Sequence, residues 1–165
     1  MELNPEIRRY YEEAPEVERL QTGCFQLEFA RTKELLQERL PQPPATILDV
    51  GGGPGAYALW LAELGYEVHL VDPVSHLISQ ARTRSDNAAK AIASFTVGDA
   101  RDLKRAGDST DAVLEFGPLY HLVHEKDRLL ALVEASRVLR PGGKVFVAGI
   151  SRFASALDGL SRDYL

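Results

Sequence analysis

Cysteine is almost absent from this sequence, and so are the long apolar runs that membrane proteins require. The single cysteine, Cys24, cannot form an internal disulfide, and a reducing compartment is the simplest interpretation. No apolar stretch approaches the roughly 20 residues of a membrane-spanning helix. Residues 1–20 are charged and lack the apolar centre of a secretory signal. These absences lead us to expect a soluble, cytoplasmic protein that makes no membrane contact.

Positive charge is also in short supply. The chain has 19 Lys and Arg residues against 24 Asp and Glu residues, which gives a formal net charge of -5 at pH 7. An acidic chain is a poor non-specific ligand for a nucleic-acid backbone, so we do not expect a nucleic acid as partner. The 165 residues suit one domain, and the 45% hydrophobic content is typical of a globular fold.

A proline-rich stretch, residues 41–44, is the clearest boundary in the chain, because proline continues neither a helix nor a central strand. Before it, Phe25, Phe29, Leu36 and Leu40 recur at helical spacing. The boundary therefore separates an N-terminal helical region from the rest of the chain.

After this boundary, short apolar runs alternate with helical patterns. Helices are expected at residues 56–64 and 75–83, and a third helix is expected to be capped by Asp127 and to end at Pro141. This alternation predicts an α/β fold with a doubly wound, mainly parallel sheet. Right-handed crossovers place the C-terminal ends of the strands on one edge, where such sheets bind ligands. The expected strands are residues 46–50, 67–71, 94–97, 112–116 and 144–148.

The main functional signal lies where the first strand turns into the first helix. Residues 49–55 read Asp-Val-Gly-Gly-Gly-Pro-Gly. Glycines let the backbone turn sharply and approach a ligand closely. The helix N-terminus that follows presents unpaired N–H groups, which favour a carboxylate or a phosphate. We expect Asp49 to brace this loop by hydrogen bonds.

Two further carboxylates follow strands at the same edge. Asp72 ends the second strand and can accept hydrogen bonds from both hydroxyls of a ribose. Asp99 follows the third strand within Gly98-Asp99-Ala100 and can accept from the exocyclic amine of adenine. The alternative role of Asp99 is to cap a turn. Together the two carboxylates predict a site for an adenine nucleoside.

The glycine loop and Asp72 leave two cofactor classes open. Gly51, Gly53 and Ala56 match the dinucleotide pattern of glycine, glycine and then glycine or alanine, and Asp72 fits it as well. A nicotinamide-dependent oxidoreductase is therefore an alternative function. Simple turn geometry is the structural alternative for the glycines.

Taken in order, the motifs resemble those of class I, Rossmann-like, S-adenosylmethionine-dependent methyltransferases. Residues 49–55 resemble that family's glycine loop, Asp72 its ribose-binding acid, and residues 98–100 its adenine-contacting motif. Residues 111–122 resemble its fourth-strand motif, and residues 140–143 resemble the turn before its fifth strand. The order of these matches favours this family over the nicotinamide enzymes.

The resemblance implies a sheet order of 3-2-1-4-5 and a site for S-adenosylmethionine, with S-adenosylhomocysteine as product. It also implies that an aromatic residue of the N-terminal arm, Tyr10 or Tyr11, folds over the cofactor. The cofactor-binding residues that we expect are Tyr11, Asp49, Gly51, Gly52, Gly53, Gly55, Asp72, Pro73, Asp99, Ala100 and Phe116.

The implied reaction is methyl transfer to a small-molecule acceptor by in-line displacement. Holding two reactants close and aligned can remove about 7–11 kcal/mol from a barrier. A general base helps when the acceptor is a hydroxyl or an amine, and the candidates are Glu115, Tyr120 and His121. No metal is required.

Members of this family close the sheet with two further strands, one of them antiparallel, and we expect these strands to be missing here. A core that binds the cofactor without turnover is therefore an alternative function. An exposed fifth strand invites pairing with another chain, so we expect a homodimer or strand exchange at that edge. The chain divides into an N-terminal helical arm or cap, a cofactor-binding core and the start of a substrate-covering insertion: residues 1–44, 45–150 and 151–165.

Overall fold

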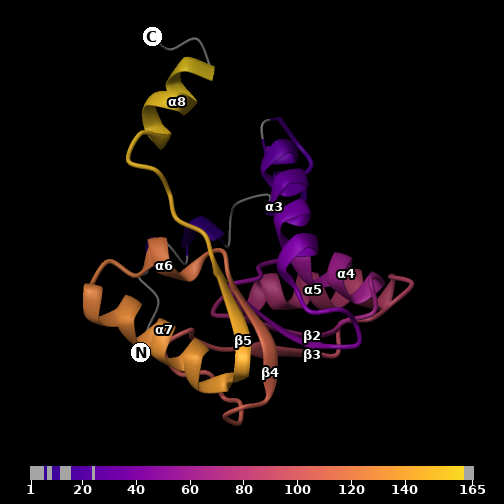
Figure 1. The fold of residues 1–165 in the computed structure, drawn as a ribbon. Coiled ribbons are helices and arrows are strands. Elements are labelled where there is room, and N and C mark those ends of the chain that lie inside the picture. Colours follow the sequence, from indigo (N-terminus) through magenta and orange to yellow (C-terminus); the bar gives the residue numbers. More distant parts are fainter. Residues whose placement is uncertain (1–5, 7–8, 12–15, 24, 162–165) are drawn as a thin grey trace.

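A five-stranded parallel sheet forms the centre of the computed structural model, which describes residues 6, 9–11, 16–23 and 25–161 (Figure 1). The strands lie in the order β3-β2-β1-β4-β5, and every neighbouring pair is parallel. This confirms the expected α/β class and the order 3-2-1-4-5. The strands are β1 (Thr46–Val50), β2 (Glu67–Asp72), β3 (Ser94–Val97), β4 (Thr110–Glu115) and β5 (Leu139–Val147).

Helices cover both faces of this sheet. Buried residues of α3, α4 and α5 share one hydrophobic cluster with Ile47 of β1. Those of α7 share a second cluster with Leu48, the next residue of the same strand. This alternation explains why all five residues of β1 are buried and why the strand reads as an apolar run. The helices are α2 (Glu16–Arg19), α3 (Phe25–Arg39), α4 (Ala56–Glu63), α5 (Ser75–Asp86), α6 (Pro118–His121), α7 (Glu125–Val138) and α8 (Ala154–Ser161).

The predicted stripe in the N-terminal region is confirmed as the inner face of α3. Leu36 and Leu40 are buried in the same cluster as α4, and Phe25 and Phe29 pack against it. Gly23 precedes the helix with a φ of 54°. The division into arm, core and insertion stays a prediction, although α3 contributes directly to the core. No helix within the described ranges has the length and apolar character needed to cross a membrane.

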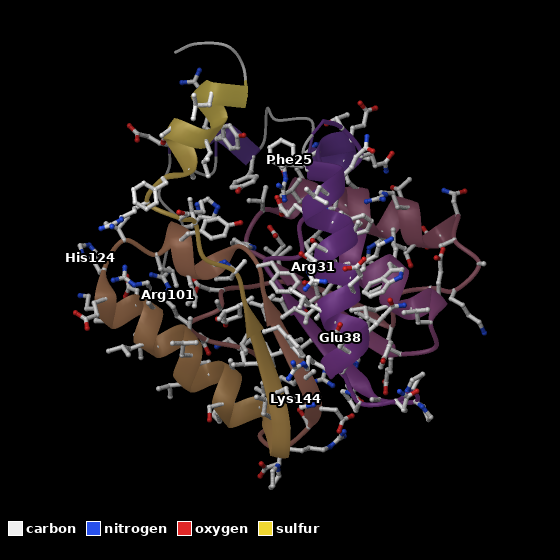
Figure 2. All side chains as sticks on the ribbon, turned by 45° about the horizontal axis from the view of Figure 1, so that its top comes forward. Phe25, Arg31, Glu38, Arg101, His124 and Lys144 are labelled. Atoms are coloured by element: carbon white, nitrogen blue, oxygen red, sulfur yellow. The ribbon has the colours of Figure 1, made fainter. Side chains whose placement is uncertain are left out.

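The prediction that Asp127 caps a helix is wrong. The helix α7 begins two residues earlier, at Glu125, and His124 precedes it without a side-chain cap. The side chain of Asp127 is instead buried and lies 3.2 Å from the guanidinium of Arg101, a residue labelled in Figure 2. A buried cation attracts this carboxylate more strongly than the helix end does, because screening by water is weak there.

The fifth strand begins at Leu139, five residues before the expected start at Lys144. The pairing with β4 slips between Thr110 and Ala112, so the turn residues 140–143 form an irregularity within the strand. A side chain at Gly143 would place its Cβ 2.8 Å from Leu139 and 3.0 Å from a backbone oxygen of Asp111. The predicted end of the helix at Pro141 is therefore wrong: the helix ends at Val138, and the strand that begins at Leu139 continues through the Pro-Gly-Gly sequence.

The core on the α4 face gives a direct test of this fold. Leu61 of α4 is fully buried, whereas Leu64 at the end of the same helix is 40% exposed. We expect Leu61→Ala to lower the free energy of unfolding by about 2–5 kcal/mol, because it leaves a cavity. Leu64→Ala serves as the matched control and should cost much less. Urea unfolding of both variants measures the difference, and equal losses would contradict the packing described.

Candidate functional site

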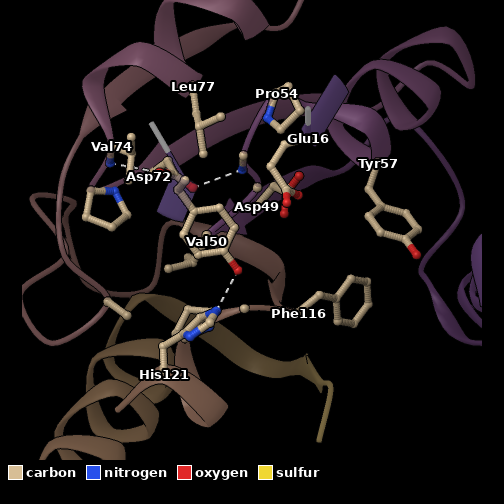
Figure 3. A pocket seen from close by; sticks show the side chains of 18 of the residues that line it. Glu16, Asp49, Val50, Pro54, Tyr57, Asp72, Val74, Leu77, Phe116 and His121 are labelled. Atoms are coloured by element: carbon tan, nitrogen blue, oxygen red, sulfur yellow. Dashed lines mark hydrogen bonds between the residues drawn. The ribbon is translucent and has the colours of Figure 1, made fainter. Parts of the chain in front are cut away.

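A cavity of about 130 Å³ lies at the C-terminal ends of β1, β2 and β4 (Figure 3). We call it the strand-end cavity. Its walls come from the loops that follow these strands, from the segment after β3, and from α2 and Tyr11 of the N-terminal region. The predicted site residues that line it are Tyr11, Asp49, Gly51, Gly52, Gly53, Asp72, Pro73, Asp99, Ala100, Phe116, Tyr120 and His121.

The glycine loop between β1 and α4 presents bare backbone to this cavity. Gly51 has a φ of 71°, and a Cβ added there would lie 2.8 Å from the ring of Pro118. At Gly52 an added Cβ would lie 2.6 Å from a carboxylate oxygen of Asp49. No other residue fits these positions without displacement of the surrounding structure, so the cradle depends on glycine.

Asp72 fixes this loop to the end of β2. Its Oδ2 accepts a hydrogen bond of 2.9 Å from the backbone N–H of Gly53, and its Oδ1 accepts one of 2.8 Å from that of Val74. Burial raises the pKa of Asp72 to about 6, although these two bonds lower it in part. Asp72 thus braces the loop, and Asp49 accepts a backbone hydrogen bond from Ala58 in the helix that follows it.

The carboxylate of Asp49 is buried without a full set of hydrogen-bond partners. Its side chain is 1% exposed, and its Oδ2 has no hydrogen-bond partner among the described residues. Burial, followed by the charge of Asp72, raises the pKa of Asp49 to about 7. A buried carboxylate oxygen without a partner is costly. Since Asp49 lines the cavity, a cationic or hydrogen-bond-donating ligand there would relieve that cost.

Asp99 lies at the opposite end of the cavity in an ion pair with Arg101. The Nε of Arg101 donates to Oδ1 at 2.8 Å, and its Nη2 donates to Oδ2 at 2.5 Å. The guanidinium is 7% exposed and also reaches Asp127. Burial alone would raise the pKa of Asp99, but the hydrogen bonds from Arg101 bring it below its usual value. Whether Asp99 contacts adenine stays a prediction.

Three aromatic side chains close the side of the cavity nearest the N-terminal region. The hydroxyl of Tyr11 and Nε2 of His121 are joined by a hydrogen bond of 2.7 Å across 110 residues of sequence (Figure 3). Tyr120 packs edge-on against His121 and donates a bond of 2.6 Å to the carbonyl of Phe116. Burial raises the pKa of Tyr11 and lowers that of His121. Both side chains are therefore uncharged near neutral pH.

The cavity leaves out two of the predicted residues, Gly55 and Glu115. A Cβ at Gly55 would lie 3.3 Å from Ala81, Ile92 and Leu70, so this glycine permits close packing of the core. It supports the loop and does not line the cavity.

Glu115 is fully buried, and neither of its carboxylate oxygens has a partner among the described residues. Strand alternation directs it to the same face as Val113, which belongs to the cluster beneath α7. Burial raises its pKa to about 7. We predicted Glu115 as a candidate base together with Tyr120 and His121. The structure separates them: Tyr120 and His121 line the cavity, whereas Glu115 does not.

Sequence reasoning missed several lining residues, above all Glu16, Arg19 and Arg101. Glu16 and Arg19 form an i,i+3 ion pair of 3.2 Å, a pattern that is common on solvated helices. Arg101 belongs to a charged run that is typical of a loop. No local signal separates these residues from ordinary surface charges.

A second, larger cavity of about 740 Å³ lies between α3 and β5, and we call it the α3–β5 cavity. Its lining is mostly apolar and includes Phe25, Leu36 and Phe146. Four residues line both cavities: Arg19, Tyr57, Phe116 and Tyr120. The two cavities therefore share a largely aromatic wall. Within the described part of the chain, no group of His, Cys, Asp or Glu side chains is arranged to hold a metal ion.

Comparison with known proteins agrees with this geometry. The family described as methyltransferase domain matches residues 47–143. A ubiquinone/menaquinone biosynthesis C-methyltransferase from Acidiphilium cryptum is 37% identical over 119 residues, which are 70% of this chain and 46% of that protein. The chain thus spans under half the length of the first curated relatives that it matches.

Solved structures share the fold. The crystal structure of a protein from Pyrococcus horikoshii has a TM-score of 0.74 at 23% identity and covers 94% of this chain and 69% of that one. The phosphoethanolamine N-methyltransferase 1 of Haemonchus contortus, solved with phosphoethanolamine and S-adenosylhomocysteine, has a TM-score of 0.68 at 22% identity over 87% of this chain and 32% of that one. With the family match across its sheet and its glycine loop, the chain belongs to the S-adenosylmethionine-dependent class I methyltransferases.

Proposed function

We propose that this chain transfers the methyl group of S-adenosylmethionine, bound in the strand-end cavity, to a small molecule in the α3–β5 cavity. The observation that carries the proposal is the buried, unpartnered Oδ2 of Asp49 beside a glycine loop without room for side chains. This combination suits a ligand that brings a positive charge and packs closely against backbone. The alternative of a core that binds the cofactor without turnover shares the same site.

The lining residues fit the cofactor group by group. The bare loop at residues 51–53 and the carboxylate of Asp49 suit the amino-acid end, whose ammonium group supplies the missing partner. Asp72 keeps lone pairs for ribose hydroxyls, because each of its oxygens accepts one hydrogen bond from the described backbone. Asp99 stays ionised through Arg101 and suits the adenine amine. When bound, S-adenosylmethionine supplies an electrophilic methyl group on a sulfonium.

The acceptor class follows from the α3–β5 cavity. Its volume of about 740 Å³ falls within the roughly 300–1,000 Å³ of small-molecule sites. Phe29 packs edge-on against Tyr57, with ring centroids 5.0 Å apart, and Tyr57 packs against Phe116 at 5.1 Å. Aromatic walls of this kind favour a flat, largely apolar acceptor. The shared wall is where the acceptor would approach the methyl group.

His121 is the residue we propose as the general base. Its imidazole is neutral because burial lowers its pKa. In the tautomer that carries its proton on Nε2, this N–H donates to the hydroxyl of Tyr11, and the lone pair of Nδ1 can take a proton from an acceptor hydroxyl or amine. Tyr11 holds the ring through the bond to Nε2, and Tyr120 lies against it. Tyr120 is placed to orient the acceptor, since it lines both cavities.

Two variants separate binding from catalysis. Asp72→Ala removes the brace of the glycine loop and should weaken S-adenosylmethionine affinity by about tenfold or more, since it leaves two buried N–H groups unpaired. His121→Ala should lower turnover by about 100-fold or more, a larger effect than its effect on S-adenosylmethionine affinity, because only the transfer step needs the base. Calorimetry with S-adenosylmethionine, S-adenosylhomocysteine and NAD, followed by a methylation assay on apolar aromatic acceptors, measures both effects.

Asp86→Ala, at an exposed position of α5, is the matched control for the loss of a carboxylate and should change neither quantity. Tight binding of NAD in place of S-adenosylhomocysteine would show that the nicotinamide alternative holds. Cofactor binding without turnover on any acceptor would favour the inactive core.

Cofactor affinity should rise with pH between about pH 5 and about pH 8. Asp72 and Asp49 have pKa values raised to about 6 and about 7, so both lose protons in this window. A cationic ligand binds their ionised forms more tightly, and binding should therefore release protons. Calorimetry in buffers of different ionisation enthalpy counts them. Asp49→Asn should flatten the upper part of the profile, and an affinity that falls with pH would contradict this linkage.

We also propose that the outer edge of β5 pairs with a second copy of the chain. In the described ranges β5 has a neighbour only on the β4 side, and Val145 and Val147 are 40% and 49% exposed. An open strand edge with apolar side chains is a template for pairing. Light scattering should show a mass that increases with concentration, and Val147→Lys should reduce it. A wild-type chain that stays monomeric throughout would rule this out.

A further inference from the structure

Glu16 is an unusual residue for a helix of only four residues near the N-terminus. Its side chain is 10% exposed although it is charged. It lines the strand-end cavity, as does Asp49, and both residues are labelled in Figure 3. Charged side chains are seldom buried unless a partner compensates them. The partner here is Arg19, at 3.2 Å.

That compensation is incomplete, because Arg19 is shared. Its guanidinium also lies 3.7 Å from Glu28 of α3. At the other end of the cavity, Arg101 neutralises Asp99. The end of the cavity at the glycine loop therefore has three carboxylates, those of Glu16, Asp49 and Asp72. The cation that pairs with Glu16, Arg19, also lies near Glu28. Burial is the main cause of the raised pKa values of Asp72 and Tyr11, and the charge of Glu16 raises both further by a smaller amount.

The substrate and the product of the proposed reaction differ in the charge on one atom, the sulfur. S-adenosylmethionine carries a positive sulfonium, whereas S-adenosylhomocysteine has a neutral thioether in the same place. Their ribose, adenine, ammonium and carboxylate groups are the same. A hydrogen bond to a shared group cannot tell the two apart, but an uncompensated negative charge can.

We propose that Glu16 is a specificity-determining residue whose carboxylate faces the positive centre of S-adenosylmethionine and makes the cavity favour it over the neutral product. The inference rests on the proposed function. The low exposure of the Glu16 side chain, 10%, supports it, because water screens a charge so little exposed only weakly. Loss of the positive charge on methyl transfer then weakens this contact and favours release of the product.

The competing role for Glu16 is to hold Arg19, which would bind the carboxylate of the cofactor. That role makes a different prediction. Both S-adenosylmethionine and S-adenosylhomocysteine carry the carboxylate, so a loss that acts through Arg19 weakens the two ligands equally. A loss of charge opposite the sulfonium weakens only the first.

Calorimetry on the full chain separates these roles. We expect Glu16→Gln to weaken S-adenosylmethionine binding by about tenfold, the scale of one charge pair in a partly buried site. Its affinity for S-adenosylhomocysteine should change less than about twofold, which also shows that the variant folds. Glu18→Gln removes the same charge from an exposed position of the same helix and should leave both affinities unchanged. Arg19→Gln should change both ligands by the same factor.

An equal loss of both ligands in Glu16→Gln overturns the inference, and so does a selective loss in Arg19→Gln that matches that of Glu16→Gln. These outcomes differ from failure of the proposed function, in which the wild-type chain binds neither ligand. A third ligand strengthens the test. An analogue with an ammonium group in place of the sulfonium should behave like S-adenosylmethionine, because it retains the positive charge.

Discussion

The two hydrogen bonds accepted by Asp72 are the constraint on which the site depends. They tie the glycine loop and the start of α5 to the end of β2, so one buried side chain joins three elements of the fold. This brace adds to the backbone hydrogen bond of 2.7 Å from Gly51 to Val71, and it matters because the glycines of the loop allow many backbone conformations. Asp72 can do this because parallel strands bring the ends of β1 and β2 side by side.

The site holds negative charge that the ligand-free protein does not fully compensate. The pKa of Asp49, raised to about 7 by burial, exceeds its value in an unfolded chain. An acid whose folded-state pKa is raised favours the folded state less and less as the pH rises through that interval. Ionised Asp49 therefore lowers the free energy of unfolding at neutral pH, at the place where we propose that a cationic ligand binds. Such perturbed groups are common in functional sites. Glu16, from the N-terminal region, contributes to the same negative electrostatic potential, so the charge of the site comes from more than one sequence motif.

The shared wall of Tyr57, Phe116, Tyr120 and Arg19 relates the two cavities to the reaction. In the function that we propose, these aromatic rings face both ligands and exclude water from between them. A transfer of this kind needs alignment more than covalent participation by the protein. The packing of α3 on the sheet is therefore part of the site, because α3 forms the opposite side of the α3–β5 cavity.

The sequence by itself determined the sheet, its strand order through resemblance, and most of the strand-end cavity. Apolar runs and glycine turns are local signals, and parallel topology brings Gly53, Asp72 and Asp99 to one edge whatever the surface residues are. The tertiary structure alone decided which charges meet there. Tyr11 with His121 and Glu16 with the glycine loop are brought together at the cavity across long stretches of chain, where no spacing rule applies. Glu115 shows the converse: it lies next to the cavity-lining residue Phe116 in sequence, but its side chain is buried on the face of the sheet beneath α7 and does not line the cavity.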